Sequence, residues 1–265
     1  MTTTESRPIA VTKYFKPTLK KPSYVGNIIA IVCGGVAFIA GLSDSSPTFL
    51  AVIGCIAFGW GFIAIFSKSS GYKEAYHEAE PKPSDKQMDE WLEQDKKGIV
   101  SDATTKLGLV PEKVLNLNDP LVVIGPKNSA KFKMGQDGII RFSAYEIMVI
   151  YLTDYHLGAY SCRWDFVNGK SISEQTQEYH YTDVVSVSTL CSSASFEVVT
   201  VDGVNRPIQS HQEFSLSVAS GESIKIAVAF PQVEMIFQKG ELLPTGADKA
   251  VMALRTMLRE KKGGV

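Results

Sequence analysis

Two long apolar stretches near the start of the chain constrain its fold more than any other feature. Val25 to Leu42 and Phe49 to Phe66 are separated only by a short polar segment, Ser43 to Thr48. Each stretch has about 18 residues without a formal charge, which as a helix spans roughly 27 Å, enough for a bilayer hydrocarbon core. The pattern predicts a transmembrane helical hairpin over residues 25–66, in a multi-pass protein of the cell (inner) membrane.

Charged residues around the hairpin predict its orientation. Arg7 and several lysines precede the first stretch, against the single acid Glu5, and Lys68 and Lys73 follow the second. The connecting segment contains no Lys or Arg. Because basic flanking segments tend to stay cytoplasmic, both termini are expected inside and the connecting segment outside. A cleaved signal peptide is the alternative, but its mature chain is expected to be soluble, whereas here a second apolar stretch follows at once.

Small residues recur four apart within both stretches. The pairs are Ala30 with Gly34, Ala37 with Gly41, Ala51 with Cys55, and Ala57 with Gly61. This spacing lets helix backbones approach closely, so these residues are expected to pack the two helices on each other or to form an oligomer face. Neither stretch contains a charged residue or His, which argues against a charged transport path through the hairpin.

Composition and motifs narrow the classes of function. The 27 basic and 28 acidic residues nearly balance, so no global field favours nucleic acid as a partner. The 4 cysteines and 4 histidines show no ligand spacing, and neither a metal site nor a cofactor is expected. The sequence has no Gly-rich phosphate loop after a strand, no GxSxG and no HExxH, so we expect a protein that is not an enzyme.

Residues outside the hairpin divide into three further segments. Residues 1–24 are polar and Pro-containing, which predicts an irregular, basic cytoplasmic lead-in. Residues 67–119 are expected to form a polar helical neck, in which Ser84 and Gln87 fit a capping box and Gly98 offers a helix end. Acidic residues occupy one face of that helix, most simply a solvated surface and alternatively a partner-docking face: Asp85, Asp89, Glu90, Glu93 and Asp95.

Residues 120–265 have the short alternating pattern of an antiparallel β domain. The candidate strands are 121–124, 138–142, 146–152, 157–166, 178–181, 184–190, 196–201, 213–218 and 224–230. Asn168-Gly169 and Asp202-Gly203 are typical of hairpin turns. A helix with one apolar face follows from Ala247 to Leu258. The expected fold class is a membrane-anchored α+β chain, in which this amphipathic helix closes an antiparallel barrel or sandwich.

Two segments of the β domain resemble bacterial pleckstrin-homology-like (PH-like) domains, which are often attached to short membrane anchors. Tyr151 to Tyr160 is similar to their strand-turn-strand, and Glu178 to Val187 is similar to their aromatic step into the next strand. The resemblance covers roughly Leu121 to Lys262. It implies a PH-like barrel or sandwich that binds lipid headgroups or peptides, or acts as a scaffold.

The same resemblance implies a headgroup site in the turn between the first two strands. Its candidate residues are Lys127, Lys131, Lys133 and Arg141. Ammonium groups near a membrane can contact phosphate, although lysines on a loop are also ordinary solubilising residues.

The function expected from the sequence is that of a non-enzymatic membrane-anchored adaptor or sensor. It binds a protein segment or a lipid headgroup at the cytoplasmic membrane face, and its partners are membrane lipids together with another protein or a second copy of the chain. One alternative is an oligomerising membrane effector that perturbs the bilayer on a trigger. Another is an accessory subunit of a larger membrane complex.

Overall fold

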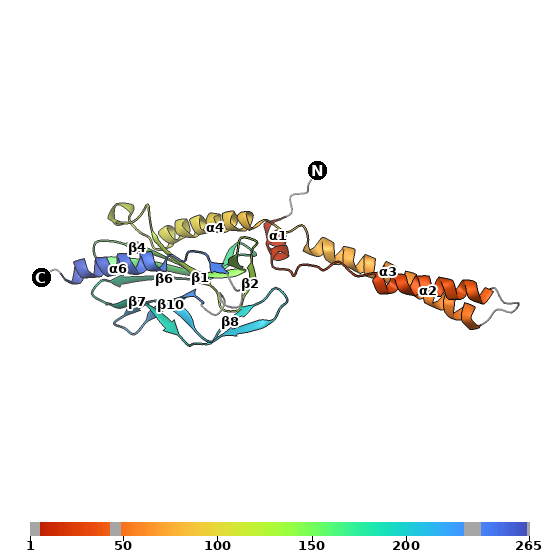
Figure 1. Cartoon of the computed structure of the whole chain (residues 1–265). Helices are drawn as coiled ribbons and strands as arrows, with labels where there is room; N and C mark the ends of the chain where they lie inside the picture. The colour runs from red at the N-terminus through yellow and green to blue at the C-terminus, as the bar shows by residue number, and fades with distance from the viewer. Residues whose placement is uncertain (1–5, 43–48, 231–239, 264–265) are drawn as a thin grey trace. The chain divides into compact units, whose positions relative to one another are not determined.

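The computed structural model describes residues 6–42, 49–230 and 240–263, with only the backbone at residues 41, 42, 49 and 50. The chain divides into two units (Figure 1). Residues 17–81 form one, here called the helical unit, and residues 1–16 together with 82–265 form the other, the globular unit. The helical unit is therefore an insertion in the sequence of the globular unit, whereas the sequence predicted consecutive segments.

The helical unit consists of α2 (Val25–Leu42) and α3 (Phe49–Ala79), which pack against each other. Over the described residues, Ala51–Ala79 is long and apolar enough to cross a membrane, and Val25–Ala40 is apolar but shorter. The α3 helix continues well past Phe66, where the apolar stretch ends. The first part of the predicted neck, residues 67–79, is thus a continuation of this helix.

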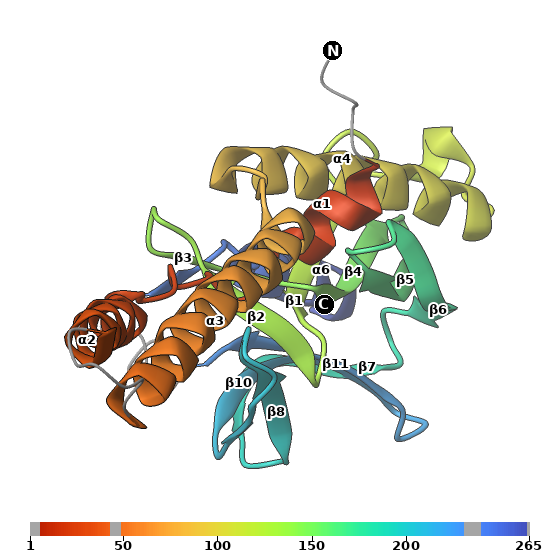
Figure 2. The same ribbon diagram turned by 90° about the vertical axis from the view of Figure 1, so that its right-hand side faces the viewer.

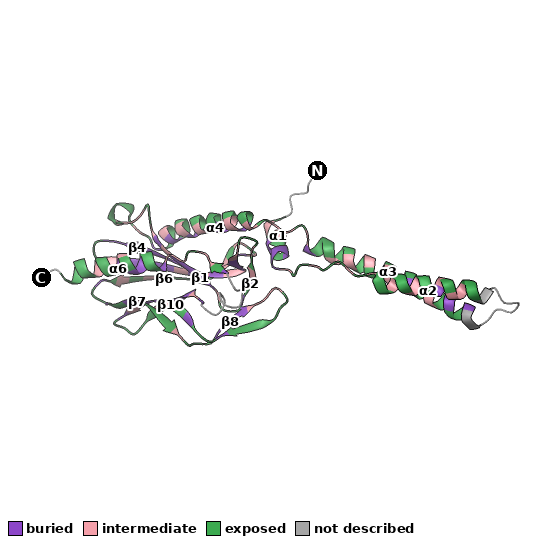
Figure 3. Ribbon diagram, in the orientation of Figure 1, coloured by how far each residue is buried: buried purple, intermediate pink, exposed green. Residues whose placement is uncertain are grey.

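Glycines let α2 and α3 approach closely. A Cβ added at Gly54 would lie 2.5 Å from the Phe38 backbone nitrogen, and one at Gly34 would lie 2.9 Å from the Gly54 carbonyl oxygen. At Gly61 an added Cβ would meet the Ile31 side chain. Bulky side chains instead cover the outer faces of both helices, which are largely exposed in Figure 3.

Of the predicted packing residues, Gly34, Ala57 and Gly61 lie at this interface. Gly34 and Gly61 are buried, and a Cβ at Gly34 would lie 3.2 Å from that of Ala57. Ala30 and Ala37 are half-buried, whereas Gly41 lies outside the residues whose side chains are described. Gly54 was missed because the four-residue spacing paired Ala51 with Cys55, and Cys55 is exposed.

Replacing Gly54 with alanine is expected to destabilise the pair of helices by about 1–3 kcal/mol, because the added methyl meets backbone atoms that cannot rotate away. Gly59→Ala is the matched control, since nothing lies within 4 Å of an added Cβ on that residue of the same helix. The comparison is the temperature at which each variant of the full chain loses its monodisperse size-exclusion peak in one detergent. Equal temperatures for the two variants would contradict this packing.

The described strands of the globular unit form three sheets. The first sheet is antiparallel and has the order β1 (Leu121–Pro126), β4 (Ala144–Leu152), β5 (His156–Asp165), β6 (Lys170–His180). The second sheet is β11 (Ser223–Ala229), β10 (His211–Val218), β7 (Val184–Ser192). The third is β12 (Glu241–Leu242), β3 (Ile139–Phe142), β2 (Ala130–Met134), β8 (Phe196–Val199), β9 (Asn205–Ile208).

The first sheet is the middle layer of the unit. On one face, Tyr145, Ile147 and Val149 pack with α4 (Asp85–Lys106). On the other face, Met148 and Ile150 pack with the second sheet and α6 (Ala247–Lys262). Figures 1 and 2 show α4 on one side of the unit and β7 and β10 on the opposite side. Because both faces of β4 are covered, its strand is buried along most of its length.

The described strands form separate sheets and do not close into one barrel, so α6 packs on β1 and β7 and does not cap a barrel end. The hairpin turns are confirmed, with Gly169 and Gly203 at φ +60 and +84. Ser84 caps α4 by accepting a hydrogen bond from the Gln87 N–H. The expected helix end at Gly98 is wrong, because α4 continues to Lys106 and one glycine costs a helix only about 1 kcal/mol.

Candidate functional site

Residues before the helical unit fold as part of the globular unit. The expectation of an irregular lead-in is wrong for Arg7–Tyr14, which form helix α1. Val11 and Tyr14 are buried in the same core as α4. This packing can stabilise a helix that would be too short to be stable alone. At the junction, Lys82 Nζ donates to the Lys16 carbonyl oxygen at 2.7 Å. The chain therefore leaves and re-enters the globular unit at one place.

Arg7 links α1 to α4 through Asp95, which also binds Trp164 on β5. Its guanidinium donates two hydrogen bonds to the Asp95 carboxylate, one of them at 2.7 Å, and Asp95 also accepts from Trp164 Nε1 at 2.8 Å. The guanidinium lies over the rings of Trp91 and Phe166, at 5.7 and 5.2 Å from their centroids. A bidentate ion pair with two aromatic neighbours is a geometry that arginine provides and lysine does not.

A second cluster surrounds Arg141 on β3. The guanidinium is bidentate to Asp89 at 2.8 and 2.7 Å and to Asp137 at 3.0 and 2.6 Å. Asp85 lies 3.8 Å away and accepts a hydrogen bond from the Tyr14 hydroxyl at 2.7 Å. Burial opposes the charged form of Arg141, but the hydrogen bonds that it donates to Asp137 and Asp89 outweigh this effect and raise its pKa. The Arg141 hydrogen bond in turn lowers the pKa of Asp137.

These clusters correct the reading of the acidic helix face. Asp85, Asp89 and Asp95 do not form a solvated surface, because they bind Arg141 and Arg7 and join α4 to the β strands. Only Glu90 and Glu93 keep largely exposed side chains, at 58% and 61%. The acidic face is thus largely an internal contact of the globular unit.

The four headgroup candidates lie in different surroundings. Lys127 is in the turn after β1, and Lys131 and Lys133 lie on the same side of β2. Lys133 Nζ is 4.0 Å from the centroid of the Tyr14 ring, a few residues before the junction with the helical unit. Arg141 is 1% exposed and engaged by carboxylates, so it does not join the lysines on the surface. The sequence did not predict its burial, because a residue that alternates with a buried one, here Ile140, is expected to face solvent.

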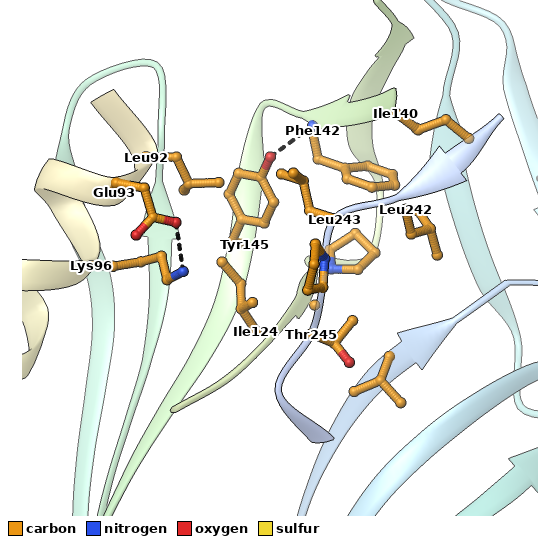
Figure 4. A pocket seen from close by; sticks show the side chains of 14 residues that line it. Leu92, Glu93, Lys96, Ile124, Ile140, Phe142, Tyr145, Leu242, Leu243 and Thr245 are labelled. Carbon is orange, nitrogen blue, oxygen red and sulfur yellow. Dashed lines mark hydrogen bonds and ion pairs between the residues drawn. The ribbon is translucent and has the colours of Figure 1, made fainter. Parts of the chain in front are cut away.

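An apolar pocket opens between α4, β1 and the segment that includes β12 (Figure 4). Its cavity of about 120 Å³ is lined by Leu92, Glu93, Lys96, Ile124, Gly125, Pro126, Ile140, Phe142, Tyr145, Val228, Leu242, Leu243, Pro244 and Thr245. Figure 4 shows the Tyr145 hydroxyl accepting from the Phe142 N–H at 3.1 Å, and the Lys96–Glu93 pair on the α4 side. The pocket is suited to a small apolar group, such as a branched or aromatic side chain.

A larger, polar groove of about 560 Å³ lies between the first sheet and β11. The residues that line it are Glu146, Ile147, Ser161, Cys162, Arg163, Ser173, Glu174, Gln175, Gln177, Ser223, Ile224, Lys225 and Ile226. Arg163 pairs with Glu146 at 3.3 Å. Burial nevertheless raises the pKa of Glu146. The sequence pattern did not indicate this groove, because its residues come from strands far apart along the chain.

Reactive side chains are scattered over the described residues. No three His, Cys, Asp or Glu side chains in that part of the chain gather as a metal site would require. His156 and His180 lie on paired strands with ring centroids 6.3 Å apart, and His211 is buried beside Glu213 at 3.0 Å. Burial raises the pKa of the Cys162 thiol to about 11, which disfavours the reactive thiolate.

Comparisons with known proteins identify no relative. No protein-family model, no curated protein and no solved structure matches this chain. Inferences about function therefore rest on the geometry of the two units.

Proposed function

We propose that the protein is a non-enzymatic membrane-anchored adaptor or sensor. In this proposal the helical unit crosses the membrane twice, and the globular unit binds a segment of another protein at the cytoplasmic face. The observation that carries the proposal is the insertion of the helical unit into the globular unit. Both ends of the insertion join one folded body, so they lie on the same side of any membrane that the helices cross. This supports an even number of crossings.

The apolar outer surface of the helical unit supports the proposal that lipid surrounds it. Trp60, Ile63 and Phe66 are 74%, 72% and 78% exposed, in a helix whose packed face includes Gly54 and Gly61. A water-exposed surface of this kind is unfavourable, because burial of apolar area contributes about 25 cal/mol per Å². The basic residues that flank the two helices favour the cytoplasm for both ends. The glycines pack α2 against α3, so they are not available to join two copies of the chain. This favours the adaptor over the oligomerising effector.

Two features of the globular unit support binding at the membrane face. The apolar pocket has the size and lining to hold one apolar side chain of a partner segment. Lys131 and Lys133 share one side of β2, and Lys133 contacts Tyr14, which lies two residues before the end of the first globular segment at Lys16, so contact of these lysines with anionic headgroups is part of the proposal. The proposal includes a relationship between the β strands of the globular unit and PH-like domains. Confinement to the membrane raises effective concentration, so that a weak contact suffices.

The test is isolation of the full chain in polymer discs cut directly from its membrane, followed by mass spectrometry and a mass estimate of the particle. We expect a foreign protein in fixed stoichiometry with the chain, and its loss when Leu243→Glu places a charge in the apolar pocket. Tyr155→Glu is the matched control, because Tyr155 is 78% exposed and lies outside the pocket. Discs that contain only copies of this chain, and that conduct ions when reconstituted, would overturn the adaptor in favour of the membrane effector.

A further inference from the structure

The free edge of β11 borders the polar groove. Over the described residues, β11 pairs with β10 on one edge and with no strand on the other. At Ala227 this other edge crosses β1, where a Cβ added to Gly125 would overlap the Ala227 carbonyl oxygen. Beyond the crossing, Ser223–Ile226 form one wall of the groove, and β4, β5 and β6 supply the rest.

The register of β10 and β11 shows which backbone groups of β11 point away from β10. Val218 N–H donates to the Glu222 carbonyl at 3.0 Å, so these two residues form a hydrogen-bonded pair. In an antiparallel ladder such pairs alternate with pairs that lack hydrogen bonds, which here include Ser217 with Ser223 and Ser215 with Lys225. The N–H and C=O of Ser223 and Lys225 therefore point away from β10. The carbonyl of Ala227, next in this series, does face outward onto β1.

The groove offers hydrogen bonds without net charge. Arg163 pairs with Glu146 at 3.3 Å, Glu174 pairs with Lys106, and Lys225 lies 3.8 Å from Glu213. The remaining lining is rich in hydroxyl and amide side chains, which come from Ser161, Ser173, Gln175, Gln177 and Ser223. The Gln177 Oε1 atom is buried and has no hydrogen-bond partner among the described residues. This chemistry suits a neutral polar ligand more than an ion.

We propose that the groove binds an extended segment of a partner polypeptide, which adds as a further strand to the free edge of β11. Outward N–H and C=O groups repeat every second residue, about 7 Å apart, and the backbone of another strand matches that spacing. Alternate side chains of the segment face the groove, where serine, threonine, asparagine or glutamine find partners. This inference rests on the proposed function and names the chemistry of the bound segment.

A second copy of this chain is a less suitable occupant. Symmetric antiparallel pairing of β11 with itself about Lys225 would place two ammonium groups opposite each other. Like charges at directly opposed positions destabilise a strand pair. A partner segment without a basic residue at that position avoids this repulsion.

The experiment presents a displayed library of random nine-residue peptides to the full chain, held in discs of phosphatidylcholine and phosphatidylglycerol. Lys225→Pro removes the outward N–H but no hydrogen bond to β10, and an edge strand tolerates proline at such a position. Lys225→Ala is the control, because it removes the same side chain and keeps the N–H. Peptides enriched on the wild-type chain are expected to bind Lys225→Ala within about twofold and Lys225→Pro at least about tenfold more weakly.

A measurement on the wild-type chain removes any dependence on how the proline variant folds. A bound library peptide is expected to slow amide hydrogen exchange at Ser223 and Lys225. The proposal is overturned if no peptide binds above empty discs, if bound peptides leave this exchange unchanged, or if β11 instead joins two copies of the chain. A natural partner that co-purifies equally with Lys225→Pro and Lys225→Ala would overturn this inference alone, because the adaptor proposal would stand.

Discussion

Replacing Arg141 with methionine is expected to lower the free energy of unfolding of the globular unit by about 3 kcal/mol. Removing one partner of a buried ion pair typically costs about 3–5 kcal/mol, because a charge is left without compensation. The lower end applies here, since the Asp89 and Asp137 side chains are 35% and 38% exposed and keep contact with water. Urea unfolding of the full chain in detergent, read by pulse proteolysis, measures the change.

Lys131→Met is the matched control for this variant. Lys131 lies on the neighbouring strand β2 and is exposed, so its loss is expected to change stability by no more than about 0.5 kcal/mol. Arg141→Lys should fall between the wild-type chain and Arg141→Met, because it keeps the charge and loses the bidentate geometry. A variant Arg141→Met as stable as the wild-type chain would show that the cluster contributes nothing to the fold.

The same cluster gives stability a pH dependence of known sign. Arg141 lowers the pKa of Asp137 below its ordinary value of 3.8, so the folded state favours the ionised carboxylate. That contribution is fully present above the unfolded pKa and is lost as the pH falls through the folded pKa. The wild-type chain should therefore lose more stability than Arg141→Met when both are brought to acid pH.

Gly125→Ala is expected to destabilise the globular unit by about 3 kcal/mol, the upper end of the usual cost of overpacking. An added Cβ would overlap the Ala227 carbonyl oxygen and lie 2.9 Å from its carbonyl carbon and 3.1 Å from the Ile226 side chain. Relief of this overlap requires β1 and β11 to separate, and that separation would open the core between the first and second sheets. The same urea titration measures the loss.

Gly98→Ala provides the contrast in sign. Gly98 lies in the interior of α4, and nothing lies within 4 Å of an added Cβ. Alanine there is expected to stabilise the unit by about 0.5–1 kcal/mol, because it loses less conformational freedom than glycine in a helix. If Gly125→Ala were neutral, β1 and β11 would not cross as closely as described.

Features with local causes could be predicted from the sequence. The Ser84 cap and the turns at Gly169 and Gly203 depend on residues within a few positions, and all three are confirmed. The α6 helix was predicted from its apolar stripe and basic end, and it spans Ala247–Lys262. Its packing on β1 and β7 depends on sheet order, which the alternating pattern does not encode.

Features with distant causes could not be predicted. Asp95 binds Arg7 from 88 positions away, and Asp89 binds Arg141 from 52 positions away. Because neither partner is near in the sequence, the acidic residues of α4 were interpreted as a solvent-exposed face. The short strands β2 and β9 were missed because few of their residues are buried. Headgroup contact stays a prediction for Lys127, Lys131 and Lys133. Arg141 is no longer a candidate, because its side chain is buried.

The contacts of α1 set an order of events during synthesis. Arg7 and Tyr14 leave the ribosome first, yet their partners Asp95, Trp164 and Asp85 are made only after the whole helical unit. At about 5–20 residues per second, synthesis from α1 to Trp164 takes about 8–30 seconds, and only then are the strands present against which the first helix packs. During that interval α2 and α3 can pair before the globular unit closes. Residues 7–14 thus reach their final place only after the chain has been made as far as Trp164.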